Sequence, residues 1–193
     1  MDVNIKESSY FWQGNKVKIR LLKNEDWKVY FEEQTDSEGF RVYEPGIPLP
    51  KTEEMFKELI ENRIKNPSSS SITFMIENLN EEVVGITSIC DRDEKNGTFS
   101  FSMRIFPKHR KKGYALEASK IVLKYGFYEL RYQKANSETI EINTASINLH
   151  HALGFKDEGR RRRNVYTNGR YYDEVLFGMT IEEFKYLHNN WRC

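Results

Sequence analysis

The sequence predicts a mixed α/β (α+β) fold whose central sheet has about seven strands, mostly antiparallel and flanked by helices. Three observations lead to this prediction. Apolar residues alternate with polar ones in several segments, most clearly at Phe99, Phe101, Met103 and Ile105. Short turns join most of these segments, which gives antiparallel pairing, and helices intervene at only a few points where strands can pair in parallel. The length of 193 residues fits a single domain, residues 1–193, that buries its own core.

Composition and charge exclude several classes of protein. Thirty Lys and Arg residues against 29 Asp and Glu leave a net charge of +1, which gives no general attraction to DNA or to an anionic membrane. Hydrophobic residues make up 38% of the chain, too many for a disordered protein. No segment approaches the roughly 18 apolar residues of a membrane span, and the N-terminus shows no apolar leader. Two cysteines without metal-ligand spacing predict a cytoplasmic protein that binds no metal.

The first third of the chain predicts one strand, two helices and a long loop. Apolar and charged residues alternate over residues 16–22, which is typical of a half-buried strand. Asn24 is the predicted cap of a helix that runs to about residue 33. Residues 39–50 are rich in glycine and proline and are predicted as a loop that forms a substrate wall. Thr52 begins a second helix with one apolar stripe.

The rest of the chain predicts strands and helices in a regular succession. Asn143 is the predicted cap of a short helix that Gly154 ends, as a glycine after a helix commonly does. Asn168-Gly169 predicts a tight hairpin turn, and Thr180 begins a capping box for a last helix. The predicted elements are strands at 72–77, 83–90 and 98–105, a helix at 114–130, a strand at 132–140, a helix at 144–153, and hairpin strands at 155–166 and 170–179.

A basic turn between the predicted strand 98–105 and the helix 114–130 has the chemistry of a phosphate site. It reads Arg110-Lys111-Lys112-Gly113-Tyr114-Ala115. The first N–H groups of a helix have no partner within the helix, and the helix dipole adds positive potential there. Gly113 permits the close approach of an anion, and Ala115 keeps the neighbouring wall small. We predict that this turn binds phosphates, although a solvated basic loop has the same composition.

The motif Arg-x-x-Gly-x-Ala resembles the acetyl-CoA pyrophosphate loop of the Gcn5-related N-acetyltransferases, the GNAT superfamily. The resemblance extends over the chain and includes Asn143-Thr144-Ala145-Ser146-Ile147, His150-His151-Ala152-Leu153-Gly154-Phe155, Glu158-Gly159 and residues 168–173. The combination of Asn-x-x-Ser, Leu-Gly-Phe and Glu-Gly is similar to the RimJ/RimL-like branch, which includes ribosomal-protein N-terminal acetyltransferases. The resemblance implies a GNAT fold that is splayed between the fourth and fifth strands.

The resemblance also implies where acetyl-CoA, the co-substrate, binds. Its pantetheine arm would pair with backbone groups of the strand that carries Met103 and Ile105, and an N–H there would stabilise the tetrahedral oxyanion. The basic turn would hold the pyrophosphate, and Asn143 would bind the arm or orient the site. The implied cofactor residues are Met103, Ile105, Arg110, Lys111, Lys112, Gly113, Tyr114, Ala115 and Asn143.

Two residues are candidates for protonating the CoA thiolate. By resemblance, Ser146 occupies the position proposed for this role in the branch, and His150 stands where many other members have a tyrosine. Helical spacing places Asn143, Ser146 and His150 on one face of their helix. Asn143 also fits a plain helix cap, and His150 a surface histidine. No general base identifies itself, and the carboxylates expected near the acceptor, each of which also fits a turn, are Glu44, Asp91, Asp93 and Asp173.

The resemblance implies an N-acetyltransferase that moves acetyl from acetyl-CoA to a primary amine by direct attack in a ternary complex. The leading acceptor is a peptide N-terminus, as in ribosomal proteins, because an α-amine with a pKa of ~7.7–8.0 is partly neutral at pH 7. A small amine such as a polyamine or an antibiotic is an alternative, as is a catalytically silent acyl-CoA-binding module. The run Arg160-Arg161-Arg162-Arg163 either contacts RNA or the ribosome or forms a solvated edge, and a free sheet edge permits a homodimer.

Overall fold

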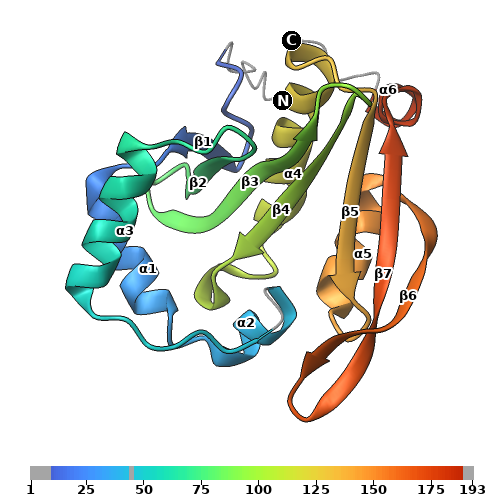
Figure 1. Cartoon of the computed structure of the whole chain (residues 1–193). Coiled ribbons are helices and arrows are strands. Elements are labelled where there is room, and N and C mark those ends of the chain that lie inside the picture. Colours follow the sequence, from blue (N-terminus) through green and yellow to red (C-terminus); the bar gives the residue numbers. More distant parts are fainter. Residues whose placement is uncertain (1–9, 44–45, 189–193) are drawn as a thin grey trace, which may run out of the picture.

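A seven-stranded sheet forms the centre of the computed structural model, which describes residues 10–43 and 46–188 (Figure 1). The strands are β1 (Val17–Leu21), β2 (Ile72–Asn78), β3 (Val83–Asp93), β4 (Thr98–Ile105), β5 (Lys134–Ile140), β6 (Lys156–Thr167) and β7 (Arg170–Thr180). Their order across the sheet is β1-β2-β3-β4-β5-β7-β6. Every neighbouring pair is antiparallel except β4 and β5, which are parallel. The predicted mixed, mostly antiparallel sheet is confirmed.

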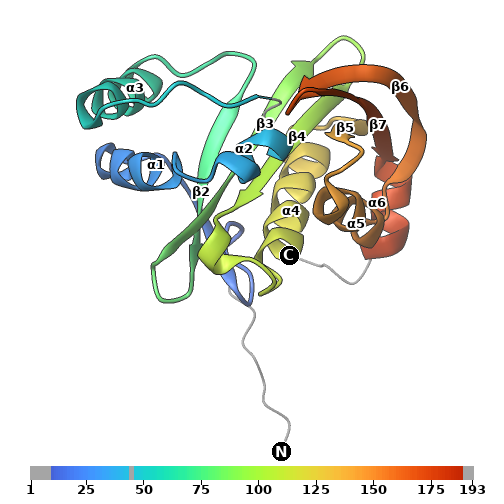
Figure 2. The same ribbon diagram turned by 90° about the horizontal axis from the view of Figure 1, so that it is seen from below.

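Helices cover both faces of this sheet (Figure 2). They are α1 (Trp27–Glu33), α2 (Ser37–Tyr43), α3 (Glu53–Lys65), α4 (Tyr114–Lys124), α5 (Thr144–Leu153) and α6 (Ile181–His188). On one face, Phe74 and Ile76 of β2 join the main core with the buried side of α4. Met75, between them in the chain, points to the opposite face and packs with α1, as the period of a strand requires. Among the described residues, no helix is long and apolar enough to cross a membrane.

The parallel strands β4 and β5 separate after a short paired stretch. They pair only at Thr98–Lys134, Phe99–Ala135 and Ser100–Asn136, and Figure 1 shows the gap widening from there. Beyond Ser100 and Asn136, the facing edges of the two strands therefore present backbone N–H and C=O groups to the gap instead of to each other. The predicted splay between the fourth and fifth strands is confirmed.

The prediction of a single loop over residues 39–50 is wrong, because the helix α2 covers Ser37–Tyr43. Asp36 begins this helix by accepting a hydrogen bond from the Gly39 N–H at 3.0 Å. A glycine in the first turn made the segment look like a loop by composition. α2 nevertheless provides part of a cavity wall, as the loop was predicted to do.

Two other predicted boundaries need correction. Asn24 does not cap α1, because it lies in a 3₁₀ turn, Asn24–Asp26, and α1 begins only at Trp27. The helix predicted to run to residue 130 is α-helical only to Lys124 and continues as a π-helical turn over Tyr125–Glu129. In both cases the prediction located a helix correctly but misplaced one boundary, the start of α1 and the end of α4.

Several local signals are confirmed in detail. Asn143 caps α5 by accepting the N–H three residues further on at 3.1 Å, and Gly154 ends that helix with a left-handed φ of 93°. Asn168-Gly169 turns the β6–β7 hairpin with positive φ at both residues. Thr180 and Glu183 exchange the two hydrogen bonds of a capping box at the start of α6. Each signal acts within four residues, which is why the sequence alone reveals it.

Candidate active site

A cavity of about 1070 Å³ lies between the separated strands. Its walls come from the second half of β4, the middle of β5, the start of α5, the helix α2 and the basic turn before α4. All of the residues predicted for catalysis or cofactor binding line it, namely Met103, Ile105, Arg110, Lys111, Lys112, Gly113, Tyr114, Ala115, Asn143, Ser146 and His150. Segments that lie far apart in the sequence thus meet around one cavity.

The basic turn has the backbone shape of an anion cradle. Lys111 and Gly113 both have left-handed φ values, 63° and 84°, and α4 begins at the next residue, Tyr114. Successive N–H groups in such a turn point toward a common centre, and the first turn of α4 adds its own N–H groups. A Cβ on Gly113 would meet only the flexible end of Lys16, at 2.9 Å, so the glycine is needed for its φ more than for space.

Arg110 holds the turn in place through its side chain. Its Nε donates to the Ile105 carbonyl at 3.1 Å, and a terminal nitrogen donates to Asp36 at 2.8 Å. The guanidinium therefore fastens the turn to the end of β4 and to the start of α2. Lys111 and Lys112 are exposed and place positive charge at this end of the cavity.

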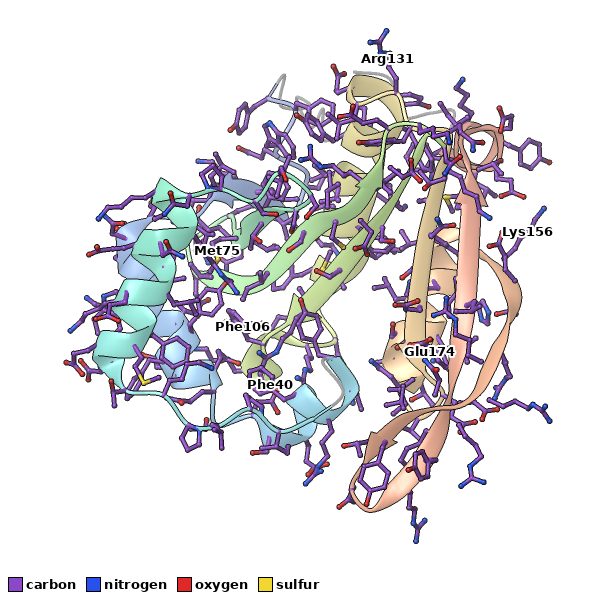
Figure 3. The ribbon with its side chains drawn as sticks, in the orientation of Figure 1. Phe40, Met75, Phe106, Arg131, Lys156 and Glu174 are labelled. Atoms are coloured by element: carbon purple, nitrogen blue, oxygen red, sulfur yellow. The ribbon has the colours of Figure 1, made fainter. Side chains whose placement is uncertain are left out.

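Asp36 also pairs with a second arginine, which the sequence did not single out. Arg104 is only 8% exposed, lies 3.3 Å from Asp36 and stacks over the ring of Phe40 at 4.1 Å. Figure 3 shows Phe40 of α2 close to the end of β4, near Phe106. The alternation of β4 predicted Arg104 on a polar face, but α2 covers that face. No pattern in the sequence links Asp36 to a residue so far along the chain.

Asn143 has two functions in the structure. Its Oδ1 accepts the Ser146 N–H at 3.1 Å, which caps α5, and its Nδ2 donates to the Val42 carbonyl at 3.1 Å, which ties α5 to the end of α2. Ser146 therefore lies in the first turn of α5, which begins at Thr144, and it lines the cavity. Both polar atoms of the Asn143 side chain are therefore occupied by contacts within the protein.

His150 is part of the cavity wall and is buried, with an exposed fraction of 4%, so it is not a surface histidine. Its Nδ1 lies 2.7 Å from the Ser146 carbonyl, and its Nε2 lies 2.7 Å from the hydroxyl of Ser137 on β5. The ring stacks on Phe177 with centroids 4.6 Å apart. Burial lowers the pKa of His150 below its ordinary value of 6.5, so the ring is neutral at pH 7. Ser137 itself was missed, because nothing in the local sequence marks it.

The carboxylates considered as general bases lie in different places. Asp91 lines the cavity. Asp93 is the last residue of β3, where hydrogen bonds from Asn96 lower its pKa. Asp173 lies on β7, where a hydrogen bond from a backbone N–H lowers its pKa, and Glu44 lies outside the described residues. Within residues 10–43 and 46–188, no three His, Cys, Asp or Glu side chains gather as metal ligands would.

Two of the four arginines of the run on β6 form ion pairs with carboxylates of neighbouring segments. Arg160 lies 3.0 Å from Glu141, and Arg161 lies 2.8 Å from Glu174, which is labelled in Figure 3. β6 is the last strand of the sheet, so these pairs form a charged edge. This arrangement favours the solvated edge and gives no support to a ribosome contact, and nothing in the described residues supports a homodimer.

The two ends of the cavity differ in charge. The basic turn follows Ile105, whereas carboxylates gather nearer Ser100, roughly 16 Å away along an extended strand. These carboxylates belong to Asp91, Glu138 and Glu158. Glu138 lies 3.1 Å from Arg161 and Glu158 lies 2.7 Å from Lys134, whereas Asp91 forms no salt bridge within the described residues. Burial raises the pKa of the Cys90 thiol to about 12, and the charges of Asp91 and Glu138 contribute to that shift. The cavity can therefore hold an anionic group at the basic turn and a cationic group beside Asp91.

Comparisons with known proteins agree with this geometry. The family model described as acetyltransferase (GNAT) domain matches residues 16–156. An uncharacterized N-acetyltransferase of Bacillus subtilis, the SPbeta prophage-derived YokL, is 34% identical over 178 residues, which cover 92% of this chain and 97% of YokL. Spermidine N(1)-acetyltransferase of Escherichia coli is 24% identical over 174 residues, which cover 90% of each chain.

Solved structures show the same fold. Spermidine N-acetyltransferase from Vibrio cholerae, solved in complex with CoA and spermine, superposes with a TM-score of 0.78 at 19% identity, over 89% of this chain and 99% of that one. A GNAT family acetyltransferase from Bacillus anthracis superposes with a TM-score of 0.74 at 24% identity, over 89% and 98% of the two chains.

Proposed function

Because the chain belongs to the GNAT acetyltransferase domain family, we propose that it transfers the acetyl group of acetyl-CoA to a small polycationic amine. The fold and the N-acetyltransferase activity follow from the family, and the acceptor is the proposed part. One observation carries it: a single cavity joins the basic turn of Lys111 and Lys112 to a carboxylate-lined end.

The described residues fit acetyl-CoA as a substrate. The turn with left-handed Lys111 and Gly113 provides N–H groups for a pyrophosphate, as helix starts commonly do. The free edges of β4 and β5 provide backbone donors and acceptors for an extended amide-containing arm. A β4 N–H near Met103 to Ile105 is the proposed donor to the oxyanion that forms when the thioester is attacked.

Ser146 is the proposed proton donor to the departing thiolate. Its hydroxyl lines the cavity at the start of α5, where Asn143 fixes the backbone. A thiolate with a pKa near ~8.5 is already a fair leaving group, so the donor contributes modestly. We expect Ser146→Ala to lower kcat about tenfold and to leave acetyl-CoA affinity unchanged. Stopped-flow thiol release and calorimetric titration measure the two quantities, and full activity would return Ser146 to a purely structural role.

The carboxylates at the far end favour a polycationic acceptor over a neutral or acidic one. Asp91 can attract an ammonium group directly, and Glu138 and Glu158, which pair with Arg161 and Lys134, add further negative charge. A polyamine presents several ammonium groups along a narrow chain. Similarity to spermidine N-acetyltransferases supports the same class of acceptor. A peptide N-terminus is the second candidate, because the Asn143 to Ser146 motif resembles the branch that acetylates ribosomal proteins.

A panel of acceptors tests this proposal directly. The purified protein with acetyl-CoA is expected to release thiol with spermidine or spermine, and kcat/KM should fall as salt screens the carboxylates. Mono-amines of similar length should react with a higher KM. Release with N-terminal peptides alone would replace the polyamine by the second candidate, and binding without release would indicate a silent acyl-CoA-binding module.

Asp91 and Asp93 form a matched pair for the acceptor end. Asp91→Asn keeps the shape and the left-handed backbone that Asn tolerates, but removes a charge from the cavity. It should raise KM for a polyamine several-fold and leave KM for a mono-amine nearly unchanged. Asp93→Asn, at the end of the same strand but outside the cavity wall, should change neither value. Equal effects of both variants would contradict the acidic acceptor end.

A further inference from the structure

A second hydroxyl faces the cavity on the other side of His150. Ser137 lies on β5, one residue beyond Asn136, the last β5 residue that pairs with β4. It lines the cavity at the point where the strands begin to separate. Its Oγ lies 2.7 Å from His150 Nε2, and the Ser146 Oγ lies 3.4 Å from His150 Nδ1. His150 thus stands between two cavity hydroxyls, one from β5 and one from α5.

The hydrogen positions in this group follow from its partners. The Ser146 carbonyl can only accept, so the His150 Nδ1 at 2.7 Å must carry the hydrogen. The neutral ring then has a free lone pair on Nε2, and the Ser137 hydroxyl donates its hydrogen to it. The oxygen lone pairs of Ser137 are left facing the cavity. A neutral histidine that accepts from a cavity hydroxyl, with its other nitrogen held by a third group, has the geometry of a general base with its relay.

Packing holds this ring in one orientation. Phe177 of β7 stacks on it, Phe101 of β4 lies 5.7 Å away, and Phe155 lies edge-on at 5.2 Å. The titratable neighbour is His151 on the same helix, and the elements that enclose the ring present phenylalanines and hydroxyls to it. The imidazole therefore cannot turn away from Ser137, and its surroundings favour the neutral, proton-accepting form.

We propose that Ser137 is a catalytic residue that takes the proton of the attacking amine and passes its own proton to His150. The proposal rests on the proposed acetyl transfer. The reaction of a neutral amine with a thioester moves one proton from nitrogen to sulfur. The group that accepts the proton from nitrogen must therefore be connected to the group that gives a proton to sulfur. His150 connects Ser137 to Ser146, the proposed donor to sulfur.

The proton balance of the relay closes in one turnover. As the amine nitrogen bonds to the carbonyl carbon, its proton goes to Ser137 Oγ and the Ser137 proton goes to His150 Nε2. The C–S bond breaks and its electron pair stays on sulfur. Ser146 then gives its hydroxyl proton to the sulfur and receives the proton that His150 carries on Nδ1. The products are the acetamide and CoA thiol. His150 is again neutral, and exchange with solvent restores its resting tautomer after the products leave.

The test compares Ser137→Ala with Ser137→Thr, which keeps a hydroxyl at the same position. The alanine variant should lose about a hundredfold in kcat, the lower end of what a positioned acid–base group contributes, with KM for acetyl-CoA unchanged. The threonine variant should recover most of kcat. Ser88→Ala is the control, since its hydroxyl bonds to Thr73 on the neighbouring strand and does not line the cavity. An alanine variant as active as the wild type, or a threonine variant as slow as alanine, would overturn the proposal.

The pH profile separates a relay from a structural contact. A base must be unprotonated, so wild-type kcat should fall as the pH drops through the pKa of His150, below its ordinary value, and stay level above it. Ser137→Ala should lose this acidic limb together with most of its rate, whereas a limb that persists would contradict the relay. A wild-type protein that releases no thiol with any amine would refute the proposed function, and an active wild type with an equally active alanine variant would refute the relay alone.

Discussion

Replacing Gly113 by valine is expected to weaken acetyl-CoA binding about a hundredfold while the protein stays folded. Gly113 has a φ of 84°, a left-handed conformation that a β-branched residue adopts only with strain. To relieve the strain, the turn must rotate the N–H groups that face the phosphates. The loss should therefore appear in the dissociation constant measured by calorimetric titration, since the start of α4 is where those groups lie.

Gly169 provides a matched control for this variant. Its φ is 75°, close to that of Gly113, and nothing lies within 4 Å of a Cβ built there. Gly169→Val should lower the melting temperature through similar backbone strain, but it lies in the β6–β7 hairpin turn and not in the cavity wall. Its acetyl-CoA affinity should equal that of the wild type. If instead the Gly113→Val protein bound acetyl-CoA as tightly as the wild type, the turn would not be the cofactor site.

Replacing Asp36 by alanine is expected to lower the free energy of unfolding by about 3 kcal/mol or more, because it leaves a buried charge unpaired. Asp36 accepts from Arg104, which is 8% exposed, and from Arg110, which fastens the basic turn. It also caps α2 through the Gly39 N–H. Urea denaturation measures the loss, and acetyl-CoA affinity should fall as well, because Arg110 no longer has its anchor.

Two further variants separate the parts of this effect. Asp36→Asn keeps an oxygen that can cap α2 but removes the charge, so the stability it regains over alanine measures the cap. Glu38→Ala removes a carboxylate of the same helix. The Glu38 side chain lies 3.0 Å from Arg41 and is 83% exposed. A surface pair of this kind contributes less than about 0.5 kcal/mol. A loss in Asp36→Ala no larger than that in Glu38→Ala would contradict the buried network.

Both predictions concern the same end of β4, and they show how the fold assembles a site. The sequence marks Gly113 clearly, because a glycine in a basic turn before a helix is a local pattern. Asp36 has no such mark. Its importance arises because α2 covers the polar face of β4 and brings it to two arginines that lie 68 and 74 residues further along the chain.

The residues inside the site also divide into those that the sequence identifies and those that only the structure reveals. The spacing of Asn143, Ser146 and His150 in one helix predicts that they share a face, and in the structure all three line the cavity. The partner of His150 on β5 could not be predicted, because Ser137 is one of many serines and its place depends on where β4 and β5 separate. The segment after residue 36 was misjudged for a related reason, since its glycine conceals a helix that packing and a distant arginine stabilise.

The sequence by itself determined the strands, the caps of α5 and α6, the hairpin turn and the basic turn of this protein. Those features depend on residues within about four positions of one another, where side-chain period and local hydrogen bonds decide the conformation. The tertiary structure alone decided the contacts of Asp36 with Arg104 and of Ser137 with His150. Contacts of that kind depend on how whole elements lie against each other, and the burial that orients those elements is distributed over the entire core.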